Sequence, residues 1–181
     1  ETATGVVTAT IADSRVSAIL HSSNGIPEDG GNNAFTITIG TADATVTAAN
    51  LNDLNALTTV NVNAANVNTI SSSSLSDINT LYTAGGVSGL GNEGVTVSDT
   101  GSIAAGTLTT ITAANGSGTL AASSAATVTG TATEIVAALA DSTITLASNV
   151  ALTVNSGTAT LSQTRTLNSG TGGVVTATVA D

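Results

Sequence analysis

The chain is built from short stretches with two different hydrophobic patterns. In the first, apolar and polar residues alternate one by one. Phe35, Ile37 and Ile39 are separated by threonines, so the three side chains share one face of an extended chain. The same period of two predicts further strands at residues 60–63, 94–98 and 150–154.

The second pattern has the spacing of a helix. Val16, Ile19 and Leu20 follow the i, i+3, i+4 rule within a predicted helix at residues 13–22. Comparable helices are predicted at 75–84 and 132–140, and weaker ones at 50–57, 102–113 and 160–167. The predicted N-cap residues are Asp13, Ser74 and Thr131, and Glu134 completes a capping box with Thr131.

One phrase stands near both ends of the sequence. Residues 5–13 read GVVTATIAD and residues 173–181 read GVVTATVAD, so eight of nine positions are identical. Related strands begin at Asn61 and Thr119, which gives steps of 55, 58 and 55 residues between Val6 and Val174. These steps predict a repeat of about 56 residues. We expect the residues after Asp181 in a longer chain, or the start of a next subunit, to resemble Ser14 onward.

Short strands that alternate with short helices favour parallel pairing. We predict an α/β repeat fold, an elongated solenoid of alternating short strands and short helices. A β-solenoid with helical corners is the alternative. A string of small β-sandwiches is less favoured, because a unit of about 55 residues buries too little core to stand alone. The predicted division is repeat 1 at 1–50 with an acidic loop at 27–33, repeat 2 at 51–106, repeat 3 at 107–163, and the start of a fourth at 164–181.

Charge excludes several classes of partner. The chain has 2 Lys+Arg against 12 Asp+Glu, a formal net charge of −10. Nucleic-acid binding is excluded because almost nothing could neutralise phosphates, and anionic membranes are disfavoured for the same reason. No run of about 18 apolar residues predicts membrane insertion. With no cysteine, disulfides and thiol chemistry are impossible.

The best metal candidate is the acidic loop at 27–33. Glu28, Asp29 and Asn32 place oxygen ligands on a turn, as Ca²⁺ requires, so the sequence offers calcium as the one possible cofactor. The alternative is a solvated insertion loop. Asp99 is a weaker candidate, because aspartates in turns commonly bond their own backbone.

Nothing in the sequence predicts catalysis. Residues 89–94 match G-x-G-x-x-G, but they lead into a strand instead of opening a helix, which favours a plain turn over a dinucleotide site. His21 is the only histidine. It could pair with Ser22, Ser23 or Asp29 in a hydrolase triad, but no nucleophile elbow frames either serine. We therefore predict that the chain is not an enzyme.

Several phrases carry a resemblance. Residues 51–54, 67–70, 94–99 and 131–139 resemble tandem repeats of very large secreted bacterial surface proteins, among them cyanobacterial and other marine adhesin-like proteins. The resemblance covers most of residues 45–181. It implies an extracellular, non-enzymatic protein that acts as a stalk, adhesin or matrix fibre, and it supplies no catalytic residues.

Together these patterns predict a structural or adhesive segment of an extracellular bacterial fibre or surface layer. Its expected partner is itself, end to end, and glycans are a further possible partner. The alternative is a module that binds Ca²⁺, glycan or ice. The Thr-x-Thr pairs are the reason for considering ice, although their spacing is irregular.

Overall fold

The computed structural model describes residues 6–12, 14–21, 23, 25–26 and 33–180. The helices among these residues are α1 (Val16–Ile19), α2 (Ala48–Ala56), α3 (Leu75–Thr83), α4 (Ala105–Ala114), α5 (Ala132–Ala140) and α6 (Leu161–Ser169), with a 3-10 turn η1 at Thr41–Asp43. The strands are β1 (Thr8–Thr10), β2 (Ala34–Thr36), β3 (Thr45–Val46), β4 (Val62–Asn63), β5 (Thr69–Ser73), β6 (Val87–Ser88), β7 (Gly94–Val97), β8 (Ser102–Ala104), β9 (Thr119–Ala122), β10 (Thr127–Thr131), β11 (Ile144–Leu146), β12 (Ala151–Ser156) and β13 (Val175–Thr176).

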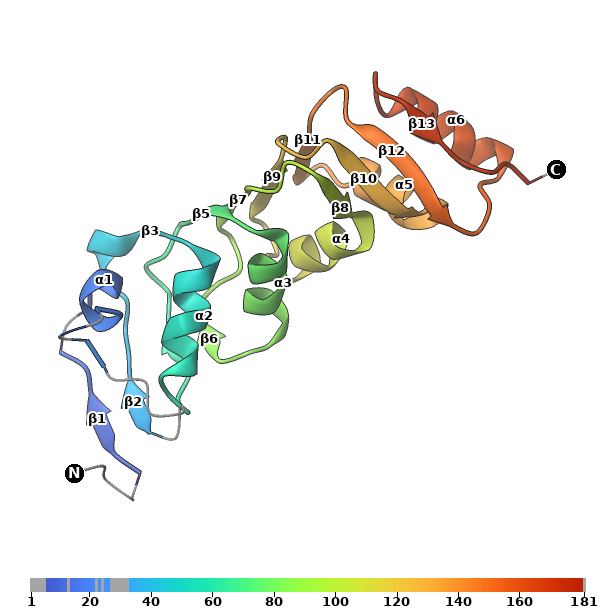
Figure 1. The fold of residues 1–181 in the computed structure, drawn as a ribbon. Coiled ribbons are helices and arrows are strands. Elements are labelled where there is room, and N and C mark those ends of the chain that lie inside the picture. The colour runs from blue at the N-terminus through green and yellow to red at the C-terminus, as the bar shows by residue number, and fades with distance from the viewer. Residues whose placement is uncertain (1–5, 13, 22, 24, 27–32, 181) are drawn as a thin grey trace.

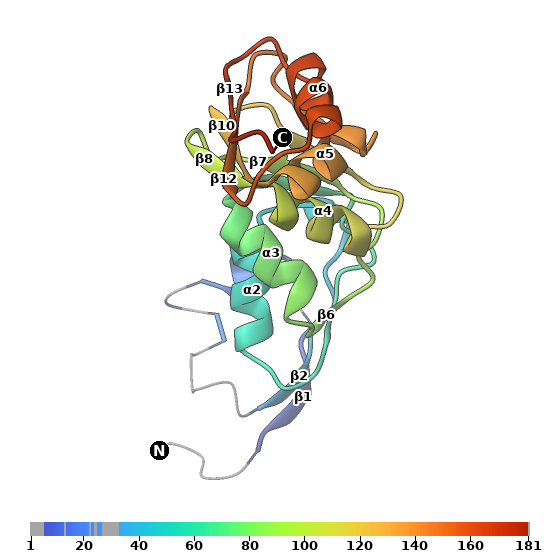
Figure 2. The same cartoon turned by 90° about the vertical axis from the view of Figure 1, so that its right-hand side faces the viewer.

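Every strand pair in the described part of the chain is parallel, as the alternation of strands and helices predicted. The largest sheet has the order β11-β9-β7-β5-β3, and a four-stranded sheet has the order β13-β12-β10-β8. Two further sheets pair β1 with β2 and β4 with β6. Helices α2 to α6 lie in a row, each packed against the next (Figures 1 and 2).

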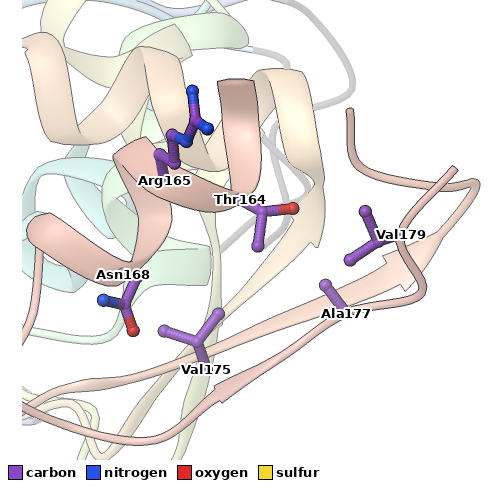
Figure 3. Close-up of a pocket in the computed structure, with 6 residues that line it drawn as sticks. All are labelled: Thr164, Arg165, Asn168, Val175, Ala177 and Val179. Atoms are coloured by element: carbon purple, nitrogen blue, oxygen red, sulfur yellow. The ribbon is translucent and has the colours of Figure 1, made fainter. Parts of the chain in front are cut away.

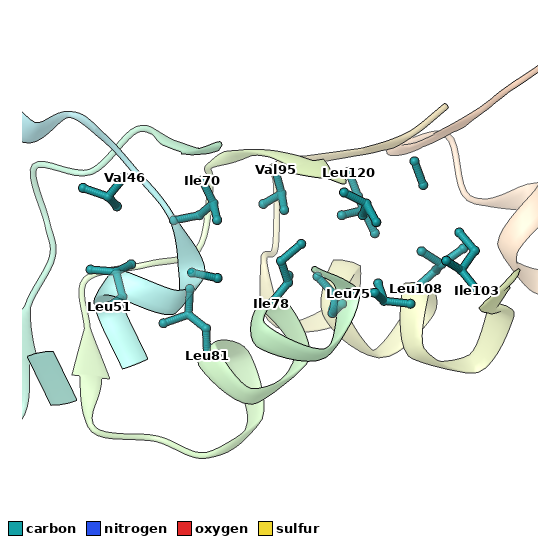
Figure 4. Packing of buried hydrophobic residues seen from close by; sticks show 14 of the residues in the cluster. Val46, Leu51, Ile70, Leu75, Ile78, Leu81, Val95, Ile103, Leu108 and Leu120 are labelled. Atoms are coloured by element: carbon teal, nitrogen blue, oxygen red, sulfur yellow. The ribbon is translucent and has the colours of Figure 1, made fainter. Parts of the chain in front are cut away.

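A line of aliphatic side chains crosses the five-stranded sheet. Val46, Ile70, Val95 and Leu120 are register partners on successive strands, and each is at most 5% exposed. They face helix residues such as Leu51 and Ile78 (Figure 4). Burying one such side chain contributes roughly 1.5–3 kcal/mol. This line is therefore the main hydrophobic contact between sheet and helices.

A second line crosses the four-stranded sheet. Ile103, Val128 and Leu152 are register partners and are buried. Val175 on β13 continues the line beside Leu152 but is only half-buried. The line therefore reaches the surface at β13.

Hydrogen bonds from neighbouring segments fix where the helices begin. The N–H of Val16 donates to Asp43 Oδ2 at 2.7 Å, that of Leu75 to Asp99 Oδ2 at 2.7 Å, and that of Ala48 to Ser73 Oγ at 2.8 Å. An acceptor satisfies an otherwise unpaired donor, and a carboxylate there also suits the positive end of the helix dipole. Asp99 thus caps α3.

The sequence placed most helices correctly. Ala132–Ala140 forms α5 with the predicted capping box of Thr131 and Glu134, and Ser74 caps α3. The first helix is shorter than predicted, at Val16–Ile19, and Asp13 lies outside the described residues. Residues 102–104 form β8 before α4, instead of belonging to the helix.

The prediction of an elongated solenoid was wrong. The structure is an α/β fold with several parallel sheets, and no repeat is evident in it. The four copies of the phrase fall in four different sheets, through β1, β4, β9 and β13. Register partners such as Thr69 and Gly94 are 25 residues apart, so a 55–58-residue step never brings similar stretches together as partners. The strand order does not test the segment boundaries at 50/51, 106/107 and 163/164, which stay a prediction.

Replacing Ile70 by alanine tests the aliphatic line. Because Ile70 is fully buried, Ile70→Ala should lower the free energy of unfolding by about 2–5 kcal/mol, measured by urea denaturation. Thr96→Ala, at an exposed position of β7, is the control and should change it by less than about 0.5 kcal/mol. Equal effects of the two substitutions would contradict this account of the core.

Candidate functional site

A polar network lies inside the protein between α3, the turn before β7 and the end of α4. Glu93 and Asn115 are 0% exposed. The Tyr82 hydroxyl lies 2.9 Å from Glu93 Oε2 and 3.1 Å from Asn115 Oδ1. Asn115 also bonds the backbone of Glu93 twice, accepting from its N–H at 3.0 Å and donating to its carbonyl at 2.9 Å.

The groups around the Glu93 carboxylate are donors. The N–H of Gly91 lies 2.9 Å from Oε2, that of Asn92 lies 3.2 Å from it, and the Tyr82 hydroxyl completes the set. This suits an ionised carboxylate, which only accepts hydrogen bonds. Burial, followed by the charge of Glu93 and the hydrogen bond to it, raises the pKa of the Tyr82 phenol well above its ordinary value. Tyr82 therefore stays a protonated donor.

This network is a structural tie. The N–H groups of Gly91 and Asn92, which belong to the G-x-G-x-x-G motif, are occupied by the chain's own carboxylate. A side chain at Gly118 would collide with the Asn115 amide and with the Glu93 carbonyl. Sequence analysis missed the network because its members are 11 to 33 residues apart and share no motif. The one signal in the sequence was that its single tyrosine, Tyr82, lies close to a glycine-rich turn.

The other predicted site residues do not come together. Glu28, Asp29 and Asn32 lie outside the described residues, as does Ser22. His21 is exposed, and its Nδ1 accepts from the N–H of Ser23 at 3.2 Å. Within the described part of the chain, no three His, Cys, Asp or Glu residues are grouped so that they could hold a metal ion.

One surface hollow is polar and has a volume of about 460 Å³. Its lining includes hydroxyls of α4, the Glu134 carboxylate and two amides, at Asn79, Thr107, Thr110, Glu134 and Asn155. Glu134 already accepts from the backbone N–H and hydroxyl of Thr131, at 2.7 and 2.9 Å. The carboxylate thus serves the capping box of α5.

A second hollow, which we call the end groove, lies between α6 and β13 and has a volume of about 350 Å³. One wall is polar and comes from α6, while the other is apolar and comes from the last strand (Figure 3). The lining residues are Thr164, Arg165, Asn168, Val175, Ala177 and Val179. Arg165 makes no hydrogen bond or ion pair within the described structure, and in Figure 3 its guanidinium points away from the strand.

The end groove exists because α6 differs from the other helices. Helices α2 to α5 bury their first, fourth and seventh residues. In α6 the first of these, Leu161, is 58% exposed, and the fourth is the half-buried Thr164. Only Leu167 is buried in this helix.

Exposed large apolar side chains occur mainly in the two copies of the end phrase and at the start of α6. Among the described residues, the large hydrophobic side chains that are exposed are Val6, Val7, Val60, Leu161, Val174 and Val179. All but Val60 belong to the two copies of the end phrase or to the start of α6. The clearest candidates for functional surfaces are therefore the two segments that carry the end phrase, the second of which lines the end groove.

Removing the Tyr82 hydroxyl tests the polar network. Tyr82→Phe leaves the buried carboxylate short of one donor and should lower the free energy of unfolding by about 1–3 kcal/mol, measured by denaturant titration. Thr80→Ala, at an exposed site on the same helix, should cost less than about 0.5 kcal/mol. If Tyr82→Phe is as stable as that control, the network is not a structural tie.

The carboxylates of Glu134 and Asp141 provide a test by pH. Hydrogen bonds from the Thr131 backbone and hydroxyl lower the pKa of Glu134, and those from the hydroxyls of Thr143 and Thr112 lower the pKa of Asp141. Because these pKa values are lower in the folded state, the groups stabilise the fold above their unfolded pKa, and this stability is lost as pH falls through the folded pKa.

An NMR titration of the carboxyl carbons measures both values. Thr131→Val should bring the pKa of Glu134 back toward its ordinary value and leave that of Asp141 unchanged. A Glu134 pKa that does not respond would show that the capping box is absent in solution.

The structure shows no helix of membrane-spanning length and hydrophobicity among its described residues. Comparisons with protein-family models, with curated proteins and with solved structures found no match to this chain. Its function must therefore be argued from the geometry.

Proposed function

We propose that this chain is a non-catalytic structural module of an extracellular bacterial fibre or surface layer, whose copies associate end to end. The observation that carries the proposal is that exposed valines lie in both copies of the end phrase, at Val6, Val7, Val174 and Val179, and that Val179 also lines the end groove. The largest apolar patches on a protein surface commonly mark sites of protein association.

The interior supports a structural role. Among the described residues, no buried side-chain nitrogen or oxygen lacks a hydrogen-bond partner. The buried carboxylate, the capping aspartates and the capping boxes are all used to hold segments of the chain together. These side chains thus serve the fold itself.

Two different ends favour a directional assembly. When an end of one copy contacts the opposite end of the next, the contact is heterologous, and such contacts build open filaments unless the rotation closes a ring. The formal charge of −10 keeps copies apart elsewhere on the surface. The resemblance to secreted bacterial surface repeats points to the cell exterior.

A ligand-binding module has less support. The polar hollow offers hydroxyls and amides to a glycan, but its described lining contains no aromatic side chain on which a sugar could stack. Its one carboxylate is engaged by Thr131. We therefore favour assembly over ligand binding.

Sedimentation velocity over a range of concentrations tests the proposal. The wild-type protein should sediment faster as concentration rises. Val179→Asp places a charge in the end groove and should weaken the association constant by at least about tenfold, which corresponds to 1.4 kcal/mol.

Val60→Asp is the matched control, since Val60 is also exposed but belongs to neither end strand. It should associate like the wild type. A wild-type protein that stays monomeric at all concentrations, or equal effects of the two variants, would overturn the proposal.

A further inference from the structure

The two end strands have nearly the same sequence but different surroundings. Val7, Ala9 and Ile11 on the first copy correspond to Val175, Ala177 and Val179 on the second. The first strand pairs with β2, and the second pairs with β12. Since both strands read the same, a neighbour that suits one is also suited to the other.

The two copies of the phrase form hydrogen bonds to their neighbouring strands through opposite strand edges. On the first strand, odd-numbered residues bond β2: the carbonyl of Val7 accepts from Ala34 at 2.8 Å, and the N–H of Ile11 donates to Thr36 at 3.0 Å. On the second strand, the even-numbered carbonyls of Val174 and Thr178 accept from Leu152 and Ala159, each at 2.8 Å.

Backbone groups of successive residues in a strand point to opposite sides within the sheet. The groups of residues 175, 177 and 179 therefore point away from β12. They are the counterparts of the groups that β1 uses to hold β2. A single strand with this sequence can pair with β12 on one edge and with β2 on the other.

The end groove runs along the strand that carries the second copy of the phrase. In the chain, β1 is followed by α1, which buries Val16 and Ile19 against the core. Among the described residues, no helix follows β13, and its inward side chains line the groove instead.

Charge favours the same pairing of ends. Residues 142–181 contain one Asp, Asp181, and one Arg, Arg165, so they carry no formal net charge. Residues 1–43 contain five Asp or Glu and a single Arg. The C-terminal end of one copy therefore does not repel the acidic N-terminal end of another, whereas two N-terminal ends would repel each other.

We infer that copies of this protein join by strand exchange: β13 of one copy takes the place of β1 in the next and pairs with its β2. The inference rests on the proposed end-to-end association. The displaced contacts are re-formed by a nearly identical sequence, so the exchange loses little, and it gains the burial of the end groove. Each copy donates a strand to the next, so the assembly stays open at both ends.

The register follows from the pairing within the chain. Thr8, Ala9 and Thr10 face Ala34, Phe35 and Thr36. In the exchanged pair, Thr178 of one copy therefore faces Thr36 of the next. If the two end strands instead stacked edge to edge without exchange, Thr178 would face Thr10.

Cysteine pairs distinguish these arrangements in a chain that has no cysteine of its own. Neighbouring strands are about 4.8 Å apart, within the Cα separation that a disulfide spans, whereas strands two places apart are not. Thr178→Cys with Thr36→Cys should give a ladder of linked copies on a non-reducing gel. Thr178→Cys with Thr10→Cys should remain monomeric there. All three positions are exposed, so both variants should melt like the wild type under reducing conditions.

Each outcome is decisive. A ladder from the Thr178/Thr10 pair alone would overturn strand exchange in favour of stacking. Concentration-dependent sedimentation with no ladder from either pair would overturn the exchange and leave the proposed function standing. A protein that neither sediments as an oligomer nor forms a ladder would overturn both, as expected if further residues of the same chain cover the end groove.

Discussion

The fold depends on the contact between lines of aliphatic side chains on parallel strands and the helices that cover them. Val46, Ile70, Val95 and Leu120 form one line, and Ile103, Val128 and Leu152 form the other. The chain has only two aromatic residues and no cysteine, so these aliphatic contacts supply most of its apolar burial. The second line does not end inside the protein but continues to the half-buried Val175.

The few charged groups serve this arrangement. Asp43 and Asp99 hold the first N–H of a helix that lies on a neighbouring segment, and Glu93 ties together α3, a turn and the end of α4. An unpaired buried polar group would cost about 1–3 kcal/mol, so each of these bonds protects the fold from a local loss of that size. These polar residues thus hold the parts of the fold in place.

The sequence predicted what depends on neighbours along the chain and missed what depends on distant contacts. The helix starts at Ser74 and Thr131 were correct, because a capping side chain and the N–H from which it accepts lie three residues apart. The solenoid was wrong, because similar phrases 55–58 residues apart hid the pairing of strands about 25 residues apart. The Tyr82–Glu93–Asn115 network could not be foreseen, since its spacing follows from the tertiary fold alone. The end groove was missed for the same reason.

The central claim is that the outward edge of the last strand becomes paired when copies meet. Amide hydrogen exchange measures this directly. The outward N–H groups of Val175, Ala177 and Val179 should exchange rapidly in dilute protein and become protected as concentration rises, while the Leu152 amide, which bonds Val174 within the chain, is protected throughout. Rapid exchange of the three outward amides at every concentration would contradict the account.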